Sequence, residues 1–305
     1  METPEAIRSG LIAPPHTPFT PDGNLDTSRI VRQADRFVRT GITGVFVCGS
    51  TGEGLSLTSA ERRTVLEAWV AASAGRLVVI AHVGCTSAQE ARELATHAKA
   101  VGADAIGALP PFYHSPATIE DLVRTMRFIA DGAVDLPFYY YHIPMLSHVQ
   151  LPMLAFADQA VEQIPNFAGI KYTHNHLVEY TALREAHPDL AMFWGLDELL
   201  VPAMSCGCVA AVGSCYNLAA RFFLKMMAAY RGGDLQDALA HHQTAVQFVS
   251  KLLPLGVVPS QKAILAGLGL DLGPPRLPLR SPDPPEAARL FDAVSRLGLL
   301  DVEPQ

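Results

Sequence analysis

The sequence predicts an α/β protein: a closed (β/α)8 TIM barrel followed by a C-terminal helical extension. Short apolar runs and helical patterns alternate eight times between residues 11 and 231. The runs are continuously apolar rather than alternating, which is typical of parallel strands covered on both faces. Eight strand-and-helix units within about 220 residues also match the usual length of such a barrel.

The boundaries of the eight units can be placed from apolar runs and helix-end signals. The expected strands are 11–13, 44–48, 77–82, 105–109, 137–141, 167–172, 191–194 and 208–212. The expected helices are 26–40, 59–74, 87–101, 118–131, 152–163, 177–186, 198–205 and 218–231. Asp26 and Ser59 are suitable N-caps, and Gly41 is a C-terminal stop. A doubly wound open sheet is the alternative, but no glycine-rich phosphate fingerprint follows the first strand.

The last 70 or so residues continue as helices without further strands. Helical patterns occupy 234–252, 260–268 and 284–297, and the stretch 273–285 contains six prolines. Proline cannot continue a helix, so this stretch is expected to be extended. We expect residues 1–232 to form the barrel and residues 233–305 an extension packed on it.

Composition excludes several classes of partner. The 305-residue chain has a formal net charge of -7 and a pI of about 5.9, which gives no electrostatic case for nucleic acid or anionic membrane. Residues 1–10 contain no apolar segment of a secretory signal, and no run approaches the roughly 18 apolar residues of a membrane span. Five cysteines, an odd number, favour reduced thiols. We therefore expect a cytoplasmic protein.

Lys171 is the first candidate for chemistry, because it stands near the end of the apolar sixth strand. An ammonium group is costly in apolar surroundings, which favours the neutral amine. A neutral amine is a nucleophile that forms a Schiff base with a carbonyl substrate. The alternative is that Lys171 ends the strand and reaches solvent.

Two other strand ends carry polar groups suited to a carboxylate and to proton transfer. Segment 49–54 (GSTGEG) follows the second strand, and its glycines, with the hydroxyls of Ser50 and Thr51, suit a small anion site. Tyr141 ends the fifth strand, where a phenol facing the barrel interior can transfer protons. The alternatives are a tight loop without a ligand and a tyrosine that belongs to the core.

An acidic pair, Asp197 and Glu198, follows the seventh strand. Carboxylates accept hydrogen bonds from hydroxyl groups, which suits a polyhydroxylated substrate. The alternative is an acidic first helical turn that is favourable to the helix dipole. His174 and His176 lack a third ligand, so we expect no metal site.

Five segments together resemble the dihydrodipicolinate synthase/N-acetylneuraminate lyase family, in its order and spacing. They are 49–53 (GSTGE), 141–144 (YHIP), 169–173 (GIKYT), 195–198 (GLDE) and 213–217 (GSCYN). The family consists of class I pyruvate aldolases built on a (β/α)8 barrel with a C-terminal helical extension. Four further segments resemble its N-acetylneuraminate lyase branch: 52–57 (GEGLSL), 61–63 (ERR), 136–144 (LPFYYYHIP) and 273–279 (GPPRLPL).

This resemblance implies reversible cleavage of N-acetylneuraminate to N-acetylmannosamine and pyruvate, with no metal or other cofactor. Lys171 would form the imine with the C2 keto group, and Tyr141 would act as the acid/base group near the carboxylate and the C4 hydroxyl. Ser50 and Thr51 would hold the carboxylate. The residues implied to position the C4 hydroxyl or to bind the sugar chain are Thr173, Gly195, Asp197, Glu198, Gly213 and Ser214.

The resemblance also implies an oligomer. In the family, a tyrosine at the position of Tyr113 reaches the site of a neighbouring subunit. The expected assembly is therefore a homotetramer, a dimer of dimers. The expected partners are a sugar acid and pyruvate.

Departures from the family define the alternatives. Dihydrodipicolinate synthases carry an arginine shortly after the tyrosine motif, and here Pro144 is followed by 145–148 (MLSH), so that activity is disfavoured. Compared with the lyase branch, His148 replaces a glycine, Cys215 a threonine, and His174 a residue that is often acidic. The alternative function is another pyruvate-dependent aldolase or dehydratase, acting on a different 2-keto-3-deoxy sugar acid or on 4-hydroxy-2-oxoglutarate. A sugar-acid sensor without turnover is a weaker alternative, because both expected catalytic residues are present.

Overall fold

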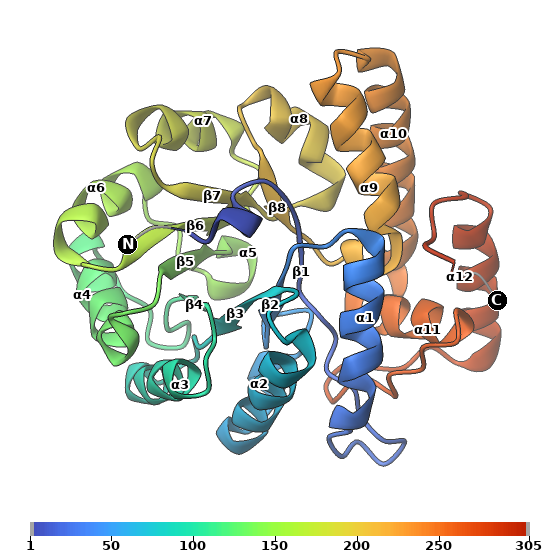
Figure 1. The fold of residues 1–305 in the computed structure, drawn as a ribbon, viewed down its shortest axis with the longest axis horizontal. Coiled ribbons are helices and arrows are strands. Elements are labelled where there is room, and N and C mark those ends of the chain that lie inside the picture. The colour runs from blue at the N-terminus through green and yellow to red at the C-terminus, as the bar shows by residue number, and fades with distance from the viewer. Residues whose placement is uncertain (1–2, 303–305) are drawn as a thin grey trace.

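Eight parallel strands form a closed barrel in the computed structural model, which describes residues 3–302 (Figure 1). Each strand pairs with the next along the chain, and the first pairs with the last. The strands are β1 (Gly10–Ala13), β2 (Gly44–Val47), β3 (Val78–His82), β4 (Ala105–Ala108), β5 (Phe138–His142), β6 (Phe167–Tyr172), β7 (Ala191–Trp194) and β8 (Ala210–Val212). The predicted (β/α)8 barrel is confirmed.

A ring of helices surrounds the barrel, one after each strand (Figure 1). The ring helices are α1 (Ile30–Thr40), α2 (Ser59–Ser73), α3 (Ala88–Ala100), α4 (Ile119–Ala130), α6 (Met153–Gln163), α7 (Leu177–Ala186), α8 (Leu200–Ser205) and α9 (Tyr216–Arg231). Short 3-10 turns are η1 (Glu5–Ile7), η2 (Thr27–Arg29), η3 (Gly54–Ser56), η4 (Asp131–Ala133), η5 (Asp197–Leu199) and η6 (Leu253–Leu255). The expected positions of the ring helices agree with these bounds to within about two residues at most ends, as usual for helix ends.

One local expectation needs correction, and one short helix was not predicted. Thr58, not Ser59, caps α2: its hydroxyl accepts from the N–H of Glu61, whose carboxylate in turn accepts from the N–H of Thr58. The reciprocal capping box selects Thr58 because the glutamate lies three residues after it. The sequence also gave no sign of α5 (Pro144–Ser147), a single turn directly after β5.

The core has an inner and an outer layer. Side chains that alternate along the strands fill the barrel interior, among them Phe46, Tyr139 and Phe193. The intervening side chains pack outward against the helices, as Tyr140 does on Phe156 with ring centroids 4.5 Å apart. This alternation is the period of two of a β-strand, and it decides which residues near the strand ends face the barrel mouth.

The C-terminal helices lie beside α9 and α1, in orange and red in Figure 1. They are α10 (Leu235–Leu252), α11 (Val257–Gly267) and α12 (Pro284–Ser295). A buried ion pair joins Lys262 of α11 to Glu53 in the loop after β2, with Nζ and Oε1 2.8 Å apart. The extension therefore contacts the loop in which we expect the carboxylate site. The division at residue 232 stays a prediction, and the outermost residues of both expected units, 1–2 and 303–305, lie outside the described residues.

Within residues 3–302, no helix is both long and apolar enough to cross a bilayer. All five cysteines of the sequence are unpaired thiols.

Candidate active site

Lys171 is the penultimate residue of β6, and only 4% of it is exposed. Its Nζ lies 3.7 Å from the centroid of the Tyr141 ring and 4.4 Å from that of Phe46. Lys171 and Tyr141 are register partners across β5 and β6, so the strand pairing itself sets this contact. The amine therefore lies in an aromatic environment at the barrel mouth, not in solvent.

The loop after β2 brings a hydroxyl to the same place. Ser50 Oγ lies 3.4 Å from Tyr141 Oη, although the two residues are 91 positions apart in sequence. Thr51 is buried next to it. Three segments from different strands thus bring together an amine, a phenol and an aliphatic hydroxyl.

Close packing fixes the path of this loop. Cys48, directly after β2, adopts a left-handed backbone conformation with φ 58°. A Cβ at Gly54 would collide with the Cys48 carbonyl oxygen, so only glycine fits there. The Thr17 hydroxyl donates to the Gly52 carbonyl at 2.6 Å, and Glu53 Oε2 accepts from the N–H of Arg276 at 2.7 Å. The loop is therefore held by the segment after β1 and by the C-terminal extension.

Asp197 provides a buried carboxylate on the other side of the mouth. Its Oδ2 accepts from the N–H of Cys215 at 2.8 Å, and its Oδ1 has no hydrogen-bond partner among the described residues. A Cβ at Gly213 would collide with Oδ1, so a side chain there would exclude the carboxylate. Burial raises the pKa of Asp197 to about 6. A buried carboxylate oxygen requires a donor, which a ligand hydroxyl or the Tyr216 hydroxyl can supply; hydrogen bonding by Tyr216 acts to lower the pKa of this carboxyl, against the effect of burial.

The neighbouring polar residues are arranged around this carboxylate. Thr173 Oγ1 is buried and unpartnered within the described chain, and Gly195 lies directly against it. Ser214 Oγ accepts from Gln261 Nε2 at 3.0 Å. Glu198 follows Asp197 in η5 and is partly exposed.

One expected site residue, Tyr113, lies apart from this group. Tyr113 follows β4, is 82% exposed and makes its ring contact with His114, and within residues 3–302 no hydrogen bond or ring contact joins it to the amine. His142 points outward, as the strand alternation predicts, with its ring centroid 5.0 Å from that of Tyr172. Burial lowers the pKa of His142 to about 3. In the part of the chain that the structure describes, no group of three or more His, Cys, Asp or Glu side chains could hold a metal ion.

Three buried polar residues at the site were missed by the sequence analysis. His82 ends β3, and its Nδ1 lies 3.0 Å from the Cys48 carbonyl oxygen. His16 Nε2 and Gln261 Oε1 are 3.0 Å apart, which ties the loop after β1 to α11. His82 is a single polar residue at the end of an apolar strand, whereas His16 and Gln261 lie among other polar residues and prolines; none of these settings reveals a distant partner.

The chain is similar to known proteins over nearly its whole length. A model of the Dihydrodipicolinate synthetase family matches residues 8–296. An N-acetylneuraminate lyase of Pongo abelii is 38% identical over 309 residues, covering 99% of this chain and 95% of that protein. The structure of the Proteus mirabilis N-acetylneuraminate lyase has a TM-score of 0.93 at 34% identity, covering 96% of this chain and 99% of that one. The sialic acid aldolase of Aliivibrio salmonicida also has a TM-score of 0.93, at 33% identity and 96% and 98% coverage.

Proposed function

The chain belongs to the Dihydrodipicolinate synthetase family, and on this basis we propose that it is an N-acetylneuraminate lyase. This carbon–carbon lyase reversibly cleaves N-acetylneuraminate to N-acetylmannosamine and pyruvate. The observation that carries the proposal is the Lys171 amine over the Tyr141 ring, with the Ser50 hydroxyl 3.4 Å from the phenol oxygen. At the barrel mouth, this arrangement brings together a nucleophile, a proton carrier and a hydroxyl that can donate a hydrogen bond to the substrate carboxylate.

The chemistry begins at Lys171. The neutral amine adds to the C2 carbonyl of the open-chain sugar acid, and loss of water gives a protonated imine. The C4 hydroxyl gives up its proton as the C3–C4 bond breaks, so C4 becomes the aldehyde carbon of the released N-acetylmannosamine. The electrons of the broken bond move toward the imine nitrogen and form an enamine. Protonation at C3 and hydrolysis then release pyruvate and restore the amine. The imine is the electron sink, so this mechanism uses no metal and no other cofactor.

The residues around the amine divide the remaining tasks. Ser50 and Thr51 donate hydrogen bonds to the carboxylate, and Tyr141 carries the proton to and from the C4 hydroxyl. Thr173, whose hydroxyl is buried without a partner, positions that hydroxyl. The sugar chain is bound by Gly195, Asp197, Glu198, Gly213 and Ser214.

A second candidate is cleavage of another 2-keto-3-deoxy sugar acid by the same chemistry. It is favoured by the departures from the lyase branch at His148, Cys215 and His174; His148 lies in the segment after β5 with a left-handed φ of 57°. In the same segment, Met145 and Leu146 are exposed, and this apolar pair leaves no cation there for the second carboxylate of a dihydrodipicolinate synthase substrate. The candidates share Lys171 and differ only in the sugar end of the substrate.

We further propose a homotetramer, a dimer of dimers, in which the exposed Tyr113 ring reaches a neighbouring subunit's site. An aromatic side chain that is 82% exposed is suited to an interface. The five unpaired thiols, four of them buried, fit the reducing cytoplasm.

The test is pyruvate release from N-acetylneuraminate, measured beside a panel of other 2-keto-3-deoxy sugar acids. Rapid release from N-acetylneuraminate alone supports the lyase, and release only from a shorter acid supports the second candidate. Borohydride reduction in the presence of pyruvate checks the shared step, because the imine is converted to a stable adduct on Lys171. Absence of that adduct contradicts both candidates.

A further inference from the structure

His82 lies beside Phe46 and Tyr141 and has no role in the mechanism described above. Its ring centroid lies 5.5 Å from that of Phe46 and 5.7 Å from that of Tyr141, at 88° to the tyrosine ring. Phe46 and Tyr141 are the two rings under the Lys171 amine. His82 is buried, so this third ring completes the aromatic surroundings of the site.

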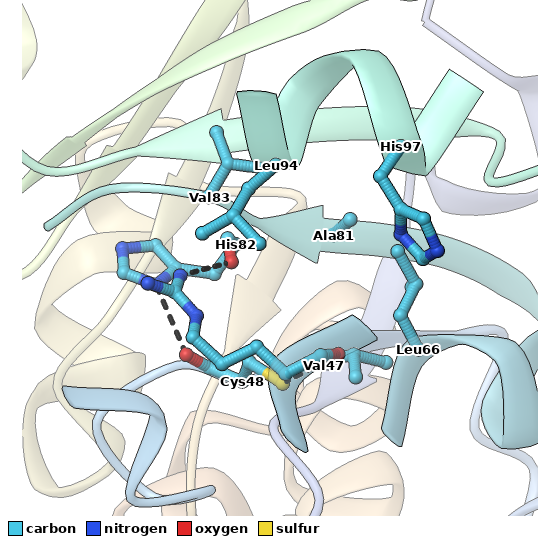
Figure 2. Close-up of a pocket in the computed structure, with 9 residues that line it drawn as sticks. Val47, Cys48, Leu66, Ala81, His82, Val83, Leu94 and His97 are labelled. Atoms are coloured by element: carbon cyan, nitrogen blue, oxygen red, sulfur yellow. Dashed lines mark hydrogen bonds between the residues drawn. The ribbon is translucent and has the colours of Figure 1, made fainter. Parts of the chain in front are cut away.

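The hydrogen bond of His82 fixes which nitrogen carries the proton. Its Nδ1 lies 3.0 Å from the Cys48 carbonyl oxygen, a contact drawn in Figure 2. A carbonyl can only accept, so Nδ1 must be the N–H donor. Burial and the nearby cation of Arg62 lower the pKa of His82 well below its usual value, so the ring is neutral. The Nε2 lone pair has no partner among the described residues.

The bond ends on the first peptide group of the carboxylate loop. Cys48 has a left-handed φ of 58°, and its carbonyl oxygen is packed so tightly against Gly54 that no Cβ fits there. The N–H of Gly54 donates to the Gly49 carbonyl at 3.1 Å and closes the loop. Ser50 lies two residues after Cys48. A change in the direction of the Cys48 carbonyl would therefore turn the Ser50 hydroxyl away from Tyr141.

The main chain at His82 is itself anchored from the helix side. Arg62 of α2 is buried, and its Nη2 donates to the His82 carbonyl oxygen at 2.7 Å. A small cavity of about 10 Å³ lies behind β2 and β3, and its lining includes Cys48, His82, Arg62 and His97 beside apolar side chains (Figure 2). The imidazole thus projects from a strand, β3, whose main chain is held by Arg62. Its position can therefore determine the position of the loop after β2.

We propose that His82 is a positioning residue for the lyase reaction: its Nδ1–H holds the Cys48 carbonyl and so aligns Ser50 and Thr51 with the substrate carboxylate. This inference rests on the proposed function. It assigns to His82 an effect on pyruvate affinity rather than on proton transfer, because the loop binds the carboxylate and Tyr141 carries the proton.

Two substitutions separate the donor from the ring. His82→Phe keeps a planar ring against Phe46 and Tyr141 and removes the donor. His82→Asn removes the ring and places an amide N–H near the position of Nδ1. The readout is the pyruvate concentration that gives half-maximal borohydride trapping on Lys171, together with thermal unfolding. We expect His82→Phe to raise that concentration at least about tenfold, as for the loss of one buried hydrogen bond. We expect His82→Asn to restore most of the affinity.

Several outcomes overturn the inference. Half-maximal trapping of His82→Phe at the wild-type concentration would reduce His82 to a structural residue, even if its melting temperature fell. Equal impairment of both variants would show that the amide donor of His82→Asn cannot replace the imidazole, so the donor alone would not account for the role of His82. If His82→Phe does not fold, His82→Gln takes its place, because its amide reaches the Nε2 position but not the Nδ1 position. Lack of trapping by the wild-type protein would instead contradict the proposed function itself, and this inference with it.

Discussion

The Lys171 Nζ atom lies 3.7 Å from the centroid of the Tyr141 ring, and the two residues are register partners on adjacent strands. The tyrosine therefore has two separable parts. Its ring face supports the amine, and its hydroxyl points to Ser50, 3.4 Å away. Substitutions can remove either the amine or the hydroxyl while leaving the other in place.

The substitution Tyr141→Phe removes the hydroxyl of Tyr141 and keeps its ring. The ring that supports the amine remains, so we expect borohydride trapping with pyruvate to persist. Loss of the proton carrier should lower kcat for sugar-acid cleavage about 10²- to 10⁴-fold. The matched control is Tyr140→Phe: that ring packs outward on Phe156 and its hydroxyl has no partner among the described residues. A Tyr141→Phe enzyme as fast as this control would rule out the assigned role.

Removal of the amine is tested by Lys171→Ala. Without the nucleophile no imine forms, so we expect at least about a thousandfold loss of activity and no borohydride adduct. Circular dichroism should show an intact barrel. The control is Lys225→Ala, because Lys225 is an exposed residue of α9. Full residual turnover of Lys171→Ala would refute the Schiff-base mechanism.

The sugar end of the site is tested by Asp197→Ala. The unpartnered Oδ1 is expected to accept a sugar hydroxyl, so the KM for the sugar acid should rise at least about tenfold. Half-maximal trapping with pyruvate should change far less, because pyruvate lacks those hydroxyls. Asp197→Asn keeps an oxygen for the Cys215 N–H and distinguishes loop support from sugar binding. Unchanged sugar kinetics in Asp197→Ala would mean that the acidic pair only stabilises the helical turn.

The sequence alone was sufficient to group the candidate residues that lie at the strand ends. In a parallel barrel every strand delivers its last residues to the same mouth, so Ser50, Tyr141 and Lys171 could be grouped before any contact was known. The fold followed for the same reason, since each strand-and-helix unit has its own apolar pattern. The segment Pro144–Ser147 could not be predicted, because one helical turn is too short to show a period.

The supporting polar residues were beyond sequence reasoning. His16 and Gln261 hydrogen-bond across 245 positions, and neither belongs to a motif. His82 is one polar residue at the end of an apolar strand, and its partner is a backbone carbonyl that carries no sequence signal. Such contacts depend on the distances between packed elements, which a pattern along one chain does not contain.

Buried histidines predict a loss of stability in acid. Burial lowers the pKa of His16 and of His142 to about 3, from an ordinary value near 6.5. The folded state then binds fewer protons than the unfolded state, so stability falls as pH drops from about 6.5 toward 3. Asp197 acts in the opposite sense: its pKa is raised to about 6, so its contribution to the free energy of unfolding falls as pH rises from about 3.8 to 6. Because two histidines oppose one aspartate, we expect the free energy of unfolding to fall overall as the pH drops.

His142→Phe isolates one of these contributions. The ring lies among Tyr140, Tyr172 and His174, so phenylalanine fits the site in shape and polarity. Between pH 6.5 and 4, the free energy of unfolding of the variant should depend less on pH, by up to about 1.4 kcal/mol per unit. Urea denaturation at several pH values measures it. Identical slopes in variant and wild type would show that this imidazole does not titrate differently in the two states.

The Glu53–Lys262 ion pair predicts that the C-terminal extension stabilises the carboxylate loop. Both side chains are almost completely buried, at 1% and 3% exposure, and their charged atoms are 2.8 Å apart. Lys262→Met leaves Glu53 buried without its cation and should cost about 3–5 kcal/mol of unfolding free energy. Glu53→Gln in the same chain removes that charge, so the double variant should recover part of the loss. A positive coupling energy in this double-mutant cycle, with pyruvate affinity that falls in Lys262→Met and recovers alongside stability, would show that α11 supports the site through Glu53. Additive losses would mean that the two charges act independently.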